Sequence, residues 1–374
     1  MVYLDYAATT PTDKKVLEVF NKVCQEYYAN SNSLHRLGNK SKELENYATT
    51  KISKILKVKN NEIIYTSGAS ESNNQAIKGI CLKYKNRGNH IITTMLEHSS
   101  VQQTINYLQE QGFLVDYVKI KDDGQIDLEH LKSLINNNTI LVSICAVDSE
   151  LGIKQPLEEI SEIVSNYPKC YLHADCTQAV GKINVDFSKI DLASISAHKI
   201  YGLKGIGILI KKENISIEPL IHGGKSTTIY RSGTPALPLI VSMMKALEIS
   251  MQNIETKYEE IKKLNIKLKE KLQEYPNVHI NSTENSIKHV INFSIKGIKP
   301  ETFLHALDNN DIYISTKSAC SSADSISTSV YAVTKNREYA NGSLRISISH
   351  LTTKEEIERF LEVFDICYQK LLLK

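Results

Sequence analysis

The sequence lacks a strong charge imbalance and any long apolar run. Its 374 residues carry 45 Lys and Arg against 42 Asp and Glu, and the net charge of +3 gives no electrostatic footprint for direct nucleic-acid binding. No run of about 18 apolar residues occurs, and the first residues contain no basic stretch followed by an apolar one. We therefore expect a cytoplasmic protein that neither spans a membrane nor carries a secretion signal.

Paired cysteines are also lacking. The seven cysteines are odd in number, scattered along the chain and without C-x-x-C spacing, so they predict neither a disulfide framework nor a metal site. Most of them have apolar neighbours, which is typical of small buried side chains. Cys320 is the exception, because it lies in a serine-rich segment.

What the sequence does contain is enough apolar material, 41% of its residues, for a large core. Because single cores stop growing near about 250–300 residues, we expect two domains. Short β-rich runs alternate with helical patterns at 62–66, 90–94, 114–118, 140–145, 170–174, 192–196 and 207–210. This alternation predicts an α/β fold with a mostly parallel seven-stranded sheet, whose ligands bind at the carboxyl ends of the strands.

The pattern changes after Pro238, where apolar residues at spacings of three and four predict a linking helix that ends before Pro276. Strand-like runs near 290–295 and 344–349 and a terminal helix after Thr353 follow. These features predict a smaller α+β C-terminal domain.

We place the large domain at residues 13–255 and the small domain at 256–374 together with residues 1–12. In the segment 315–329, 7 of 15 residues are serine, so it cannot bury itself well. We expect it to be a mobile loop.

A lysine follows one of the predicted strands. Ser196-Ala197-His198-Lys199 ends the run at 192–196 and precedes a Gly-containing turn. A lysine in that place can form a Schiff base with a carbonyl cofactor, with the serine and histidine serving a phosphate and a ring. The same letters fit a solvated surface lysine or the S-x-x-K pattern of serine acylases, although the accompanying K-T-G and S-D-N motifs are missing.

A carboxylate ends another predicted strand. The apolar run from Tyr171 finishes at Asp175, with Gln178 three residues later. Asp175 could pair with a protonated pyridine nitrogen or cap the following helix. His173, Asp175 and Cys176 could also suggest a metal site, but neighbouring residues of a strand point to opposite faces.

Three further features complete a possible pocket. Thr66–Asn73 passes from a strand through small residues into a helix, whose amides suit a phosphate or an ordinary cap. His98 can stack on an aromatic ring, and the fork of Arg345 can bind a carboxylate. Taken one at a time, His98 could equally be a buried core histidine and Arg345 a surface arginine. Together, these features predict pyridoxal phosphate as the cofactor.

Motifs spread over nearly the whole chain carry a resemblance to a known family. They are Tyr3–Pro11, Ser33–His35, Thr66–Asn74, Glu97-His98, His173–Asp175 with Gln178, Ser194–Gly202, Arg231–Thr234 and Ser318–Cys320. On these motifs the sequence resembles the cysteine desulfurases of the NifS/IscS type, within the class V aminotransferase group. The resemblance implies a pyridoxal-phosphate fold type I homodimer with active sites at the subunit interface, L-cysteine as substrate, and a sulfur-acceptor protein in iron–sulfur assembly or tRNA thiolation.

The resemblance also implies roles for the residues around the cofactor ring. Lys199 would form the Schiff base and remove the α-proton, Asp175 would pair with the pyridine nitrogen, and His98 would stack on the ring. Gln178 would donate to the phenolic oxygen. The family usually has Asn-Asn-Glu where this chain has Asp148-Ser149-Glu150, so Ser149 replaces an amide that contacts the same oxygen.

The remaining implied roles concern the phosphate, the substrate and the sulfur. Four residues of one chain would hold the phosphate, namely Ala69, Ser70, Ser196 and His198. Thr234 of the partner subunit would join them. Arg345 would bind the substrate carboxylate, and the thiolate of Cys320 would receive the sulfur, leaving alanine.

Two alternatives stay open at this point. The departures at Ser149 and at Ser226-Thr227, where the family has Gln-Glu, fit a homologue that binds partners but has lost turnover. The pocket would also serve another pyridoxal enzyme, such as a selenocysteine lyase or an aminotransferase, whose activity would not need Cys320.

Overall fold

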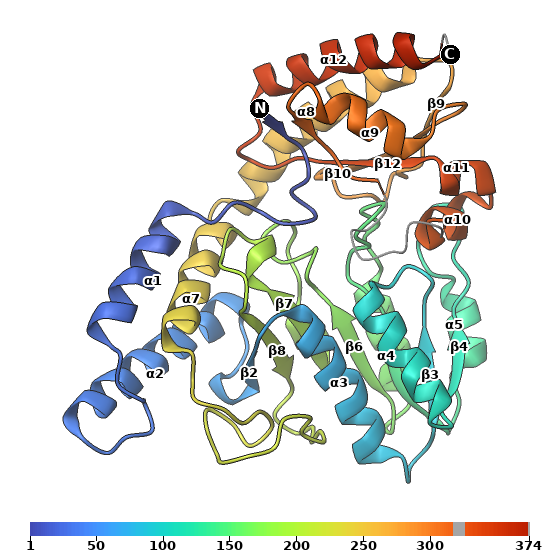
Figure 1. Ribbon diagram of the computed structural model, residues 1–374. Helices are drawn as coiled ribbons and strands as arrows, with labels where there is room; N and C mark the ends of the chain where they lie inside the picture. The colour runs from blue at the N-terminus through green and yellow to red at the C-terminus, as the bar shows by residue number, and fades with distance from the viewer. Residues whose placement is uncertain (317–325, 373–374) are drawn as a thin grey trace.

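The computed structural model describes residues 1–316 and 326–372, which form a large sheet with helices on its two faces and a smaller unit above it (Figure 1). The large sheet has seven strands in the order β2-β8-β7-β6-β5-β3-β4. They are β2 Ile63–Thr66, β3 His90–Thr93, β4 Leu114–Tyr117, β5 Thr139–Ser143, β6 Tyr171–Asp175, β7 Leu192–Ser196 and β8 Gly207–Lys211. Only β8 runs antiparallel to its neighbours, so the predicted mostly parallel sheet is confirmed.

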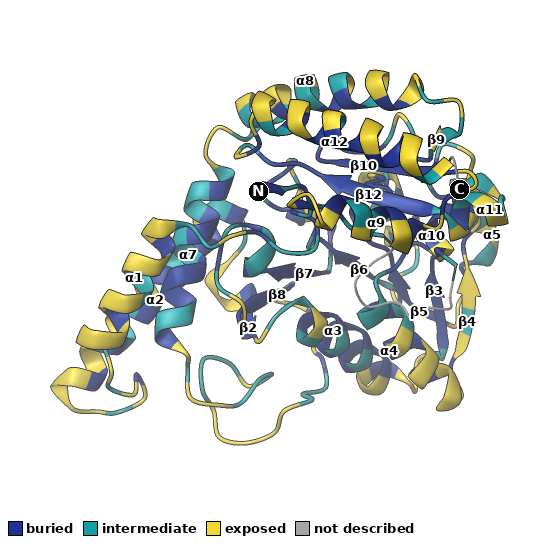
Figure 2. Ribbon diagram, turned by 45° about the horizontal axis from the view of Figure 1, so that its top comes forward, coloured by how far each residue is buried: buried dark blue, intermediate teal, exposed yellow. Residues whose placement is uncertain are grey.

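Most strands of this sheet are buried on two faces, which explains their nearly continuous apolar sequences. Ile91 and Leu141 pack into one core cluster, whereas the next residues, Ile92 and Val142, pack into another on the opposite face. The helices that cover the sheet are α1 Lys14–Glu26, α2 Arg36–Leu56, α3 Ala69–Tyr84, α4 Ser99–Glu110, α5 Leu128–Leu134, α6 Leu157–Ser165 and α7 Leu237–Met251. Figure 2 shows them with buried inner and exposed outer sides around dark strands.

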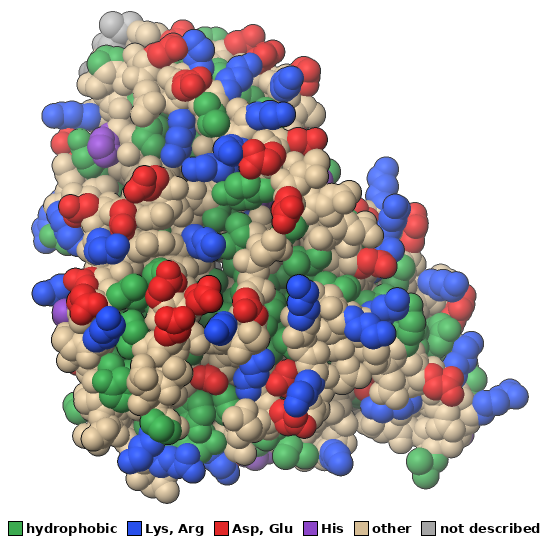
Figure 3. Space-filling model, turned by 180° about the vertical axis from the view of Figure 1, so that it is seen from behind, with side chains coloured by type: hydrophobic (Ala, Val, Ile, Leu, Met, Phe, Trp, Pro, Cys, Tyr) green, Lys and Arg blue, Asp and Glu red, His purple; other side chains and the backbone are tan. Residues whose placement is uncertain are grey.

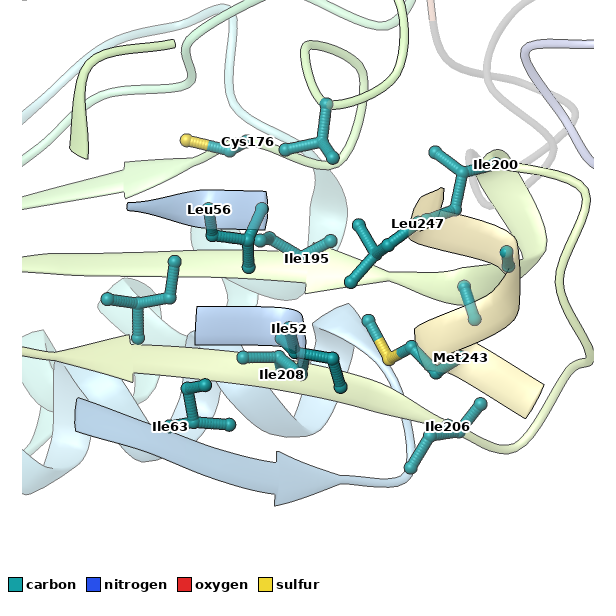
Figure 4. Packing of buried hydrophobic residues seen from close by; sticks show 14 of the residues in the cluster. Ile52, Leu56, Ile63, Cys176, Ile195, Ile200, Ile206, Ile208, Met243 and Leu247 are labelled. Atoms are coloured by element: carbon teal, nitrogen blue, oxygen red, sulfur yellow. The ribbon is translucent and has the colours of Figure 1, made fainter. Parts of the chain in front are cut away.

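One core cluster joins α2 and α7 to the sheet (Figure 4). Ile52 of α2 and Met243 of α7 lie over Ile195 of β7 and Ile208 of β8 in this cluster. Cys176 belongs to it as well, as expected for a small apolar side chain. The packing fixes the ends of β6 and β7, from which the candidate site is built.

The smaller unit is a three-stranded antiparallel sheet covered by helices. Its strands are β9 Val278–Ile280, β10 Val290–Ile295 and β12 Ser343–Ser347, with β10 in the middle. The helices of this unit are α8 Ile254–Gln273, α9 Pro300–Asp308 and α12 Lys354–Leu372. The N-terminal strand β1 Val2–Tyr3 pairs with β11 Ile312–Tyr313, far away in the sequence.

The core of this unit supports the domain division that we propose, 13–255 for the large domain and 256–374 with 1–12 for the small one. Its buried side chains come from residues 2–4 and 261–368. Helices α10 Thr328–Thr334 and α11 Arg337–Asn341 belong to the small domain in sequence but do not pack into its core alone. Their residues Val330 and Ala340 pack into a cluster of the large domain. The chain between β11 and β12 therefore contacts the two domains.

The loop predicted over 315–329 extends too far, because α10 begins at Thr328. Ser327 caps this helix by accepting a hydrogen bond from the amide of Val330. Residues 317–325, which include Cys320, lie outside the described residues, so the rest of that loop prediction stays a prediction. Within the described ranges, no helix is long and apolar enough to cross a membrane.

We predict that Phe364→Ala destabilises the protein strongly. Phe364 of α12 is fully buried, and its ring packs against Phe293, Phe303 and Phe360. Truncation leaves a cavity, so the free energy of unfolding in urea should fall by about 3–5 kcal/mol. Ile366→Ala on the same helix is the control, because Ile366 is 61% exposed, and equal losses in the two variants would contradict this packing.

Candidate active site

A cavity of about 540 Å³ lies at the carboxyl ends of the strands, between the two domains. Its volume is typical of small-molecule sites. Among the predicted site residues it is lined by Ala69, Ser70, His98, Ser149, Asp175, Gln178, Ser196, His198, Lys199 and Arg345. Thr234, which the resemblance gives to the partner's site, is exposed on a loop and does not line this cavity. Cys320 lies outside the described residues.

Lys199 reaches the cavity from a short 3-10 turn, Ala197–Lys199, directly after β7. Gly202 closes the turn, and a Cβ there would lie 2.8 Å from the carbonyl oxygen of Ala197. The Nζ of Lys199 donates to the carbonyl oxygens of Ala7 and Ala8, each at 2.6 Å. The N-terminal segment thus holds the amine in place, which was not foreseen.

Asp175 ends β6 and is 7% exposed. Its Oδ1 accepts from the backbone amide of Thr177 at 2.9 Å, so it does cap the following turn. Its Oδ2 accepts from the side-chain amide of Asn73 at 2.8 Å. Both donors are neutral amides, so neither forms an ion pair with the carboxylate. The two interpretations of Asp175 are therefore compatible.

The start of α3 meets the end of β7 at the cavity. Gly68 precedes the helix, and a Cβ on it would lie 3.7 Å from the hydroxyl of Ser196. The free amides of the first turn and the hydroxyls of Ser70 and Ser196 therefore face one region. Such a helix start favours an anion.

Two histidines border the same cavity. The Nδ1 of His98 accepts from the amide of Ser100 at 3.1 Å, which orients the ring at the start of α4. The Nδ1 of His198 lies 3.2 Å from the hydroxyl of Thr9. Burial lowers the pKa of His98, and burial together with the charge of Lys199 lowers the pKa of His198 to about 4. Both rings are therefore neutral near pH 7.

Arg345 enters the cavity from β12 of the small domain and is 2% exposed. One terminal nitrogen pairs with Oδ1 of Asp5 at 2.8 Å, and the other donates to the carbonyl of Ser149 at 2.9 Å. The buried Nε has no hydrogen-bond partner within the described part of the chain. A guanidinium fixed in this way is suited to bind a carboxylate.

The metal interpretation of His173–Cys176 finds no support in the geometry. The ring nitrogens of His173 lie 2.8 Å and 3.1 Å from the hydroxyls of Ser143 and Ser194. Cys176 points into the core cluster of Figure 4. Among the residues that the structure describes, no group of His, Cys, Asp and Glu side chains is arranged to hold a metal ion.

Sequence reasoning missed three residues that position the site. Asn73 holds Asp175, Asp5 holds Arg345, and Glu97 links the ends of β3 and β5 by accepting from Thr94 and from the amide of Cys145. Burial raises the pKa of Glu97 to about 8. All three lie inside the motifs named above, but Asn73 and Asp5 have partners 102 and 340 positions away, and Cys145 lies 48 positions from Glu97.

A larger groove of about 1030 Å³ lies elsewhere, lined by residues that include Ala146, Lys182, Tyr258 and Ile287. On the rear of the molecule, hydrophobic side chains gather in the middle and charged ones border them (Figure 3). We assign the site to the smaller cavity, because the lysine, the aspartate, the arginine and the start of α3 converge there.

Comparison with known proteins identifies the family of this chain. Residues 2–360 match the family described as aminotransferase class-V. The chain belongs to this family. A protein named cysteine desulfurase IscS from Clostridium botulinum strain Hall is 39% identical over 369 residues, which cover 97% of this chain and 93% of that protein.

Two further proteins extend the similarity. A NifS/IcsS protein homolog of Lactobacillus delbrueckii subsp. bulgaricus is 38% identical, with 99% of this chain and 97% of that protein covered. A solved structure of a NifS-like protein superimposes with a TM-score of 0.93 at 35% identity and covers 98% of this chain and 99% of its own. The family membership and the fold are therefore established over nearly the full chain.

We predict that Asp5→Ala destabilises the protein, because it leaves the buried guanidinium of Arg345 without its carboxylate. The loss in free energy of unfolding should be about 3 kcal/mol in urea denaturation. Glu358→Ala, which removes a partner from the exposed Lys267–Glu358 pair, is the control and should cost at most about 1 kcal/mol. Similar effects of the two variants would contradict the proposed importance of the buried pair.

We also predict a pH effect from His173. Burial lowers its pKa from the ordinary 6.5 to about 4, so the unfolded chain binds a proton between these values while the native protein does not. Stability should fall as the pH decreases from 6.5 to 4, and His173→Gln should remove about 3 kcal/mol of that fall. Urea denaturation at several pH values tests this, with His222→Gln at an exposed position as control.

Proposed function

We propose that the protein is a pyridoxal-phosphate-dependent cysteine desulfurase, which converts L-cysteine to L-alanine and holds the sulfur as a persulfide on Cys320. The observation that carries the proposal is the convergence of Lys199, Asp175, Arg345 and the start of α3 on one cavity. The curated relatives named cysteine desulfurase support it. So does a solved structure of SspA in complex with cysteine, 31% identical with a TM-score of 0.83.

The donor set of the cavity fits pyridoxal phosphate, on which enzymes of this family generally depend. Lys199 suits the aldehyde, Asp175 the pyridine nitrogen and Gln178 the phenolic oxygen. The start of α3, with Ser70, Ser196 and His198, suits the phosphate. The buried hydroxyl of Thr177 lines the same cavity without a hydrogen-bond partner in the described residues, as expected where a ligand supplies one.

Pyridoxal phosphate bound there supplies an electron sink for the bond broken at the α-carbon of an amino acid. Arg345 binds the substrate carboxylate and sets its orientation. The amine of Lys199, held by the carbonyls of Ala7 and Ala8, takes the proton from the α-carbon. The neutral ring of His98 lines the same cavity. Its Nδ1 accepts from the amide of Ser100 at the start of α4, so Nε2 is the ring nitrogen that can pass protons.

The sulfur step joins the thiolate of Cys320 to the substrate sulfur. A sulfur–sulfur bond forms as the carbon–sulfur bond breaks, and the electron pair stays with the substrate carbon, which takes a proton to become the methyl group of alanine. The thiol and cysteine thus give a persulfide and alanine with no other oxidant. A sulfur-acceptor protein then receives the sulfur in the cytoplasm.

We propose that the protein acts as a homodimer, in which Thr234 of the partner subunit completes the phosphate site. Large apolar side chains on the surface support this. Leu34 is 94% exposed, Tyr28 is 76% exposed and Ile229 is 64% exposed. Covering such side chains is a common consequence of dimer formation.

We predict that Lys199→Ala abolishes the visible absorbance of the purified protein and its alanine production from L-cysteine. Cys320→Ser should keep the absorbance and lose desulfuration, because it removes only the sulfur-accepting thiol. Sulfide and alanine assays with dithiothreitol test the pair. Colourless wild-type protein would overturn the function, and activity that survives Cys320→Ser would favour another pyridoxal enzyme.

A further inference from the structure

Lys182 is a buried cation that the mechanism above does not use. It follows β6 by seven positions, and only 9% of it is exposed. Among the residues that the structure describes, no carboxylate lies within ion-pair distance of its Nζ. The nearby charges of Lys199 and Arg345 are positive, and they add to burial in lowering the pKa of Lys182 to about 7.

Such a placement costs stability. Lysine is almost never buried without a partner of opposite charge, because the ammonium loses its hydration. Like charges nearby add to the penalty. Stability therefore does not explain why a lysine occupies this position, and a role in the adjacent site does.

The hydrogen bonds of Lys182 lead directly to that site. Its Nζ donates to Oε1 of Gln178, four residues earlier, at 2.6 Å. Gly181, with a φ of +75°, lets the chain turn here, and a Cβ at this position would lie 2.9 Å from Ile200. On the other side of the amide, Nε2 of Gln178 donates to the carbonyl of Ala7 at 2.9 Å.

These contacts fix which end of the amide faces the cavity. The Nζ of Lys182 lies at hydrogen-bond distance from Oε1, so the amide turns its oxygen toward Lys182. Its Nε2 then donates one hydrogen to the carbonyl of Ala7, and the second remains for the cavity that Gln178 lines. Without Lys182, only the carbonyl of Ala7 holds the amide in this orientation, and the amide oxygen loses its donor.

We propose that Lys182 is a positioning residue, which orients the Gln178 amide so that its N–H donor faces the cofactor cavity. The inference rests on the proposed function, in which that donor bonds the phenolic oxygen of pyridoxal phosphate. Lys182 touches neither cofactor nor substrate and acts through Gln178. It lines the larger groove of about 1030 Å³ and does not line the candidate site, which Gln178 does.

The test compares Lys182→Met, which removes the donor, with Lys182→Arg, which keeps a cationic one. Apo-protein is titrated with pyridoxal 5′-phosphate, and the affinity, absorbance spectrum and melting temperature are measured. Lys182→Met should bind about tenfold more weakly, as expected for a lost hydrogen bond of about 1.4 kcal/mol. Its visible band should weaken against the near-ultraviolet band, because a carbonyl oxygen facing the phenolic oxygen disfavours the anionic form.

Two comparisons separate positioning from a structural role. The affinity of Lys182→Arg for pyridoxal 5′-phosphate should stay within about twofold of wild type. In a Gln178→Met background, Lys182→Met should weaken that affinity by less than about twofold, since the lysine acts only through the amide. The melting temperature of apo Lys182→Met should equal or exceed that of wild type. A lower melting temperature with an unchanged spectrum would assign a structural role and overturn the proposal.

Other outcomes also decide the matter. Wild-type affinity and spectrum in Lys182→Met would overturn the proposal, as would a full effect of that change in the Gln178→Met background. Wild-type protein that binds no pyridoxal phosphate would overturn the proposed function and this inference with it. Binding by wild type together with an unaffected Lys182→Met would overturn the inference alone.

Discussion

The site depends on one short segment, residues 5–10, whose backbone lies between the two domains. Its carbonyl at Ala7 accepts from Lys199 and from Gln178 of the large domain, and its amide there donates to the hydroxyl of Ser347 in the small domain. Asp5 pairs with Arg345. Because each of these groups is largely buried, losing the segment would leave several polar atoms unsatisfied at once. The segment therefore couples the folding of the two domains to the geometry of the cavity.

Burial also determines the protonation of the groups around the cavity. Burial removes water from the neighbouring imidazoles, and the charge of Lys199 adds to this effect, so the pKa values of His98 and His198 fall. Lys199, in contrast, donates to main-chain carbonyls, and Arg345 pairs with the carboxylate of Asp5. Neutral imidazoles, the guanidinium of Arg345 and the start of α3 together give a cavity that suits an anionic ligand.

The sequence allowed the strands and their ends to be predicted, because apolar runs followed by polar residues are a local signal. Asp175 and Lys199 were found in this way. Their partners were not, because Asn73 lies 102 positions from Asp175 and Asp5 lies 340 positions from Arg345. Carbonyl partners such as those of Ala7 and Ala8 leave no signal in a side chain. The end of the serine-rich loop was misplaced because Thr328 and Ser329 begin a helix through the cap at Ser327, although their own residue types favour a loop.

The departure of this chain from the family pattern at Ser149 has limited structural consequences. Arg345 donates to the main-chain carbonyl of Ser149, and that bond is independent of the side chain there. The neighbouring carboxylates connect this segment to the start of α10, because Asp148 accepts from Ser329 and Glu150 accepts from Ser327. The hydroxyl of Ser149 takes part in none of these three hydrogen bonds, which orient Arg345 and α10. Ser149 lines the cavity, so we expect its exchange to change what the cavity offers to a ligand.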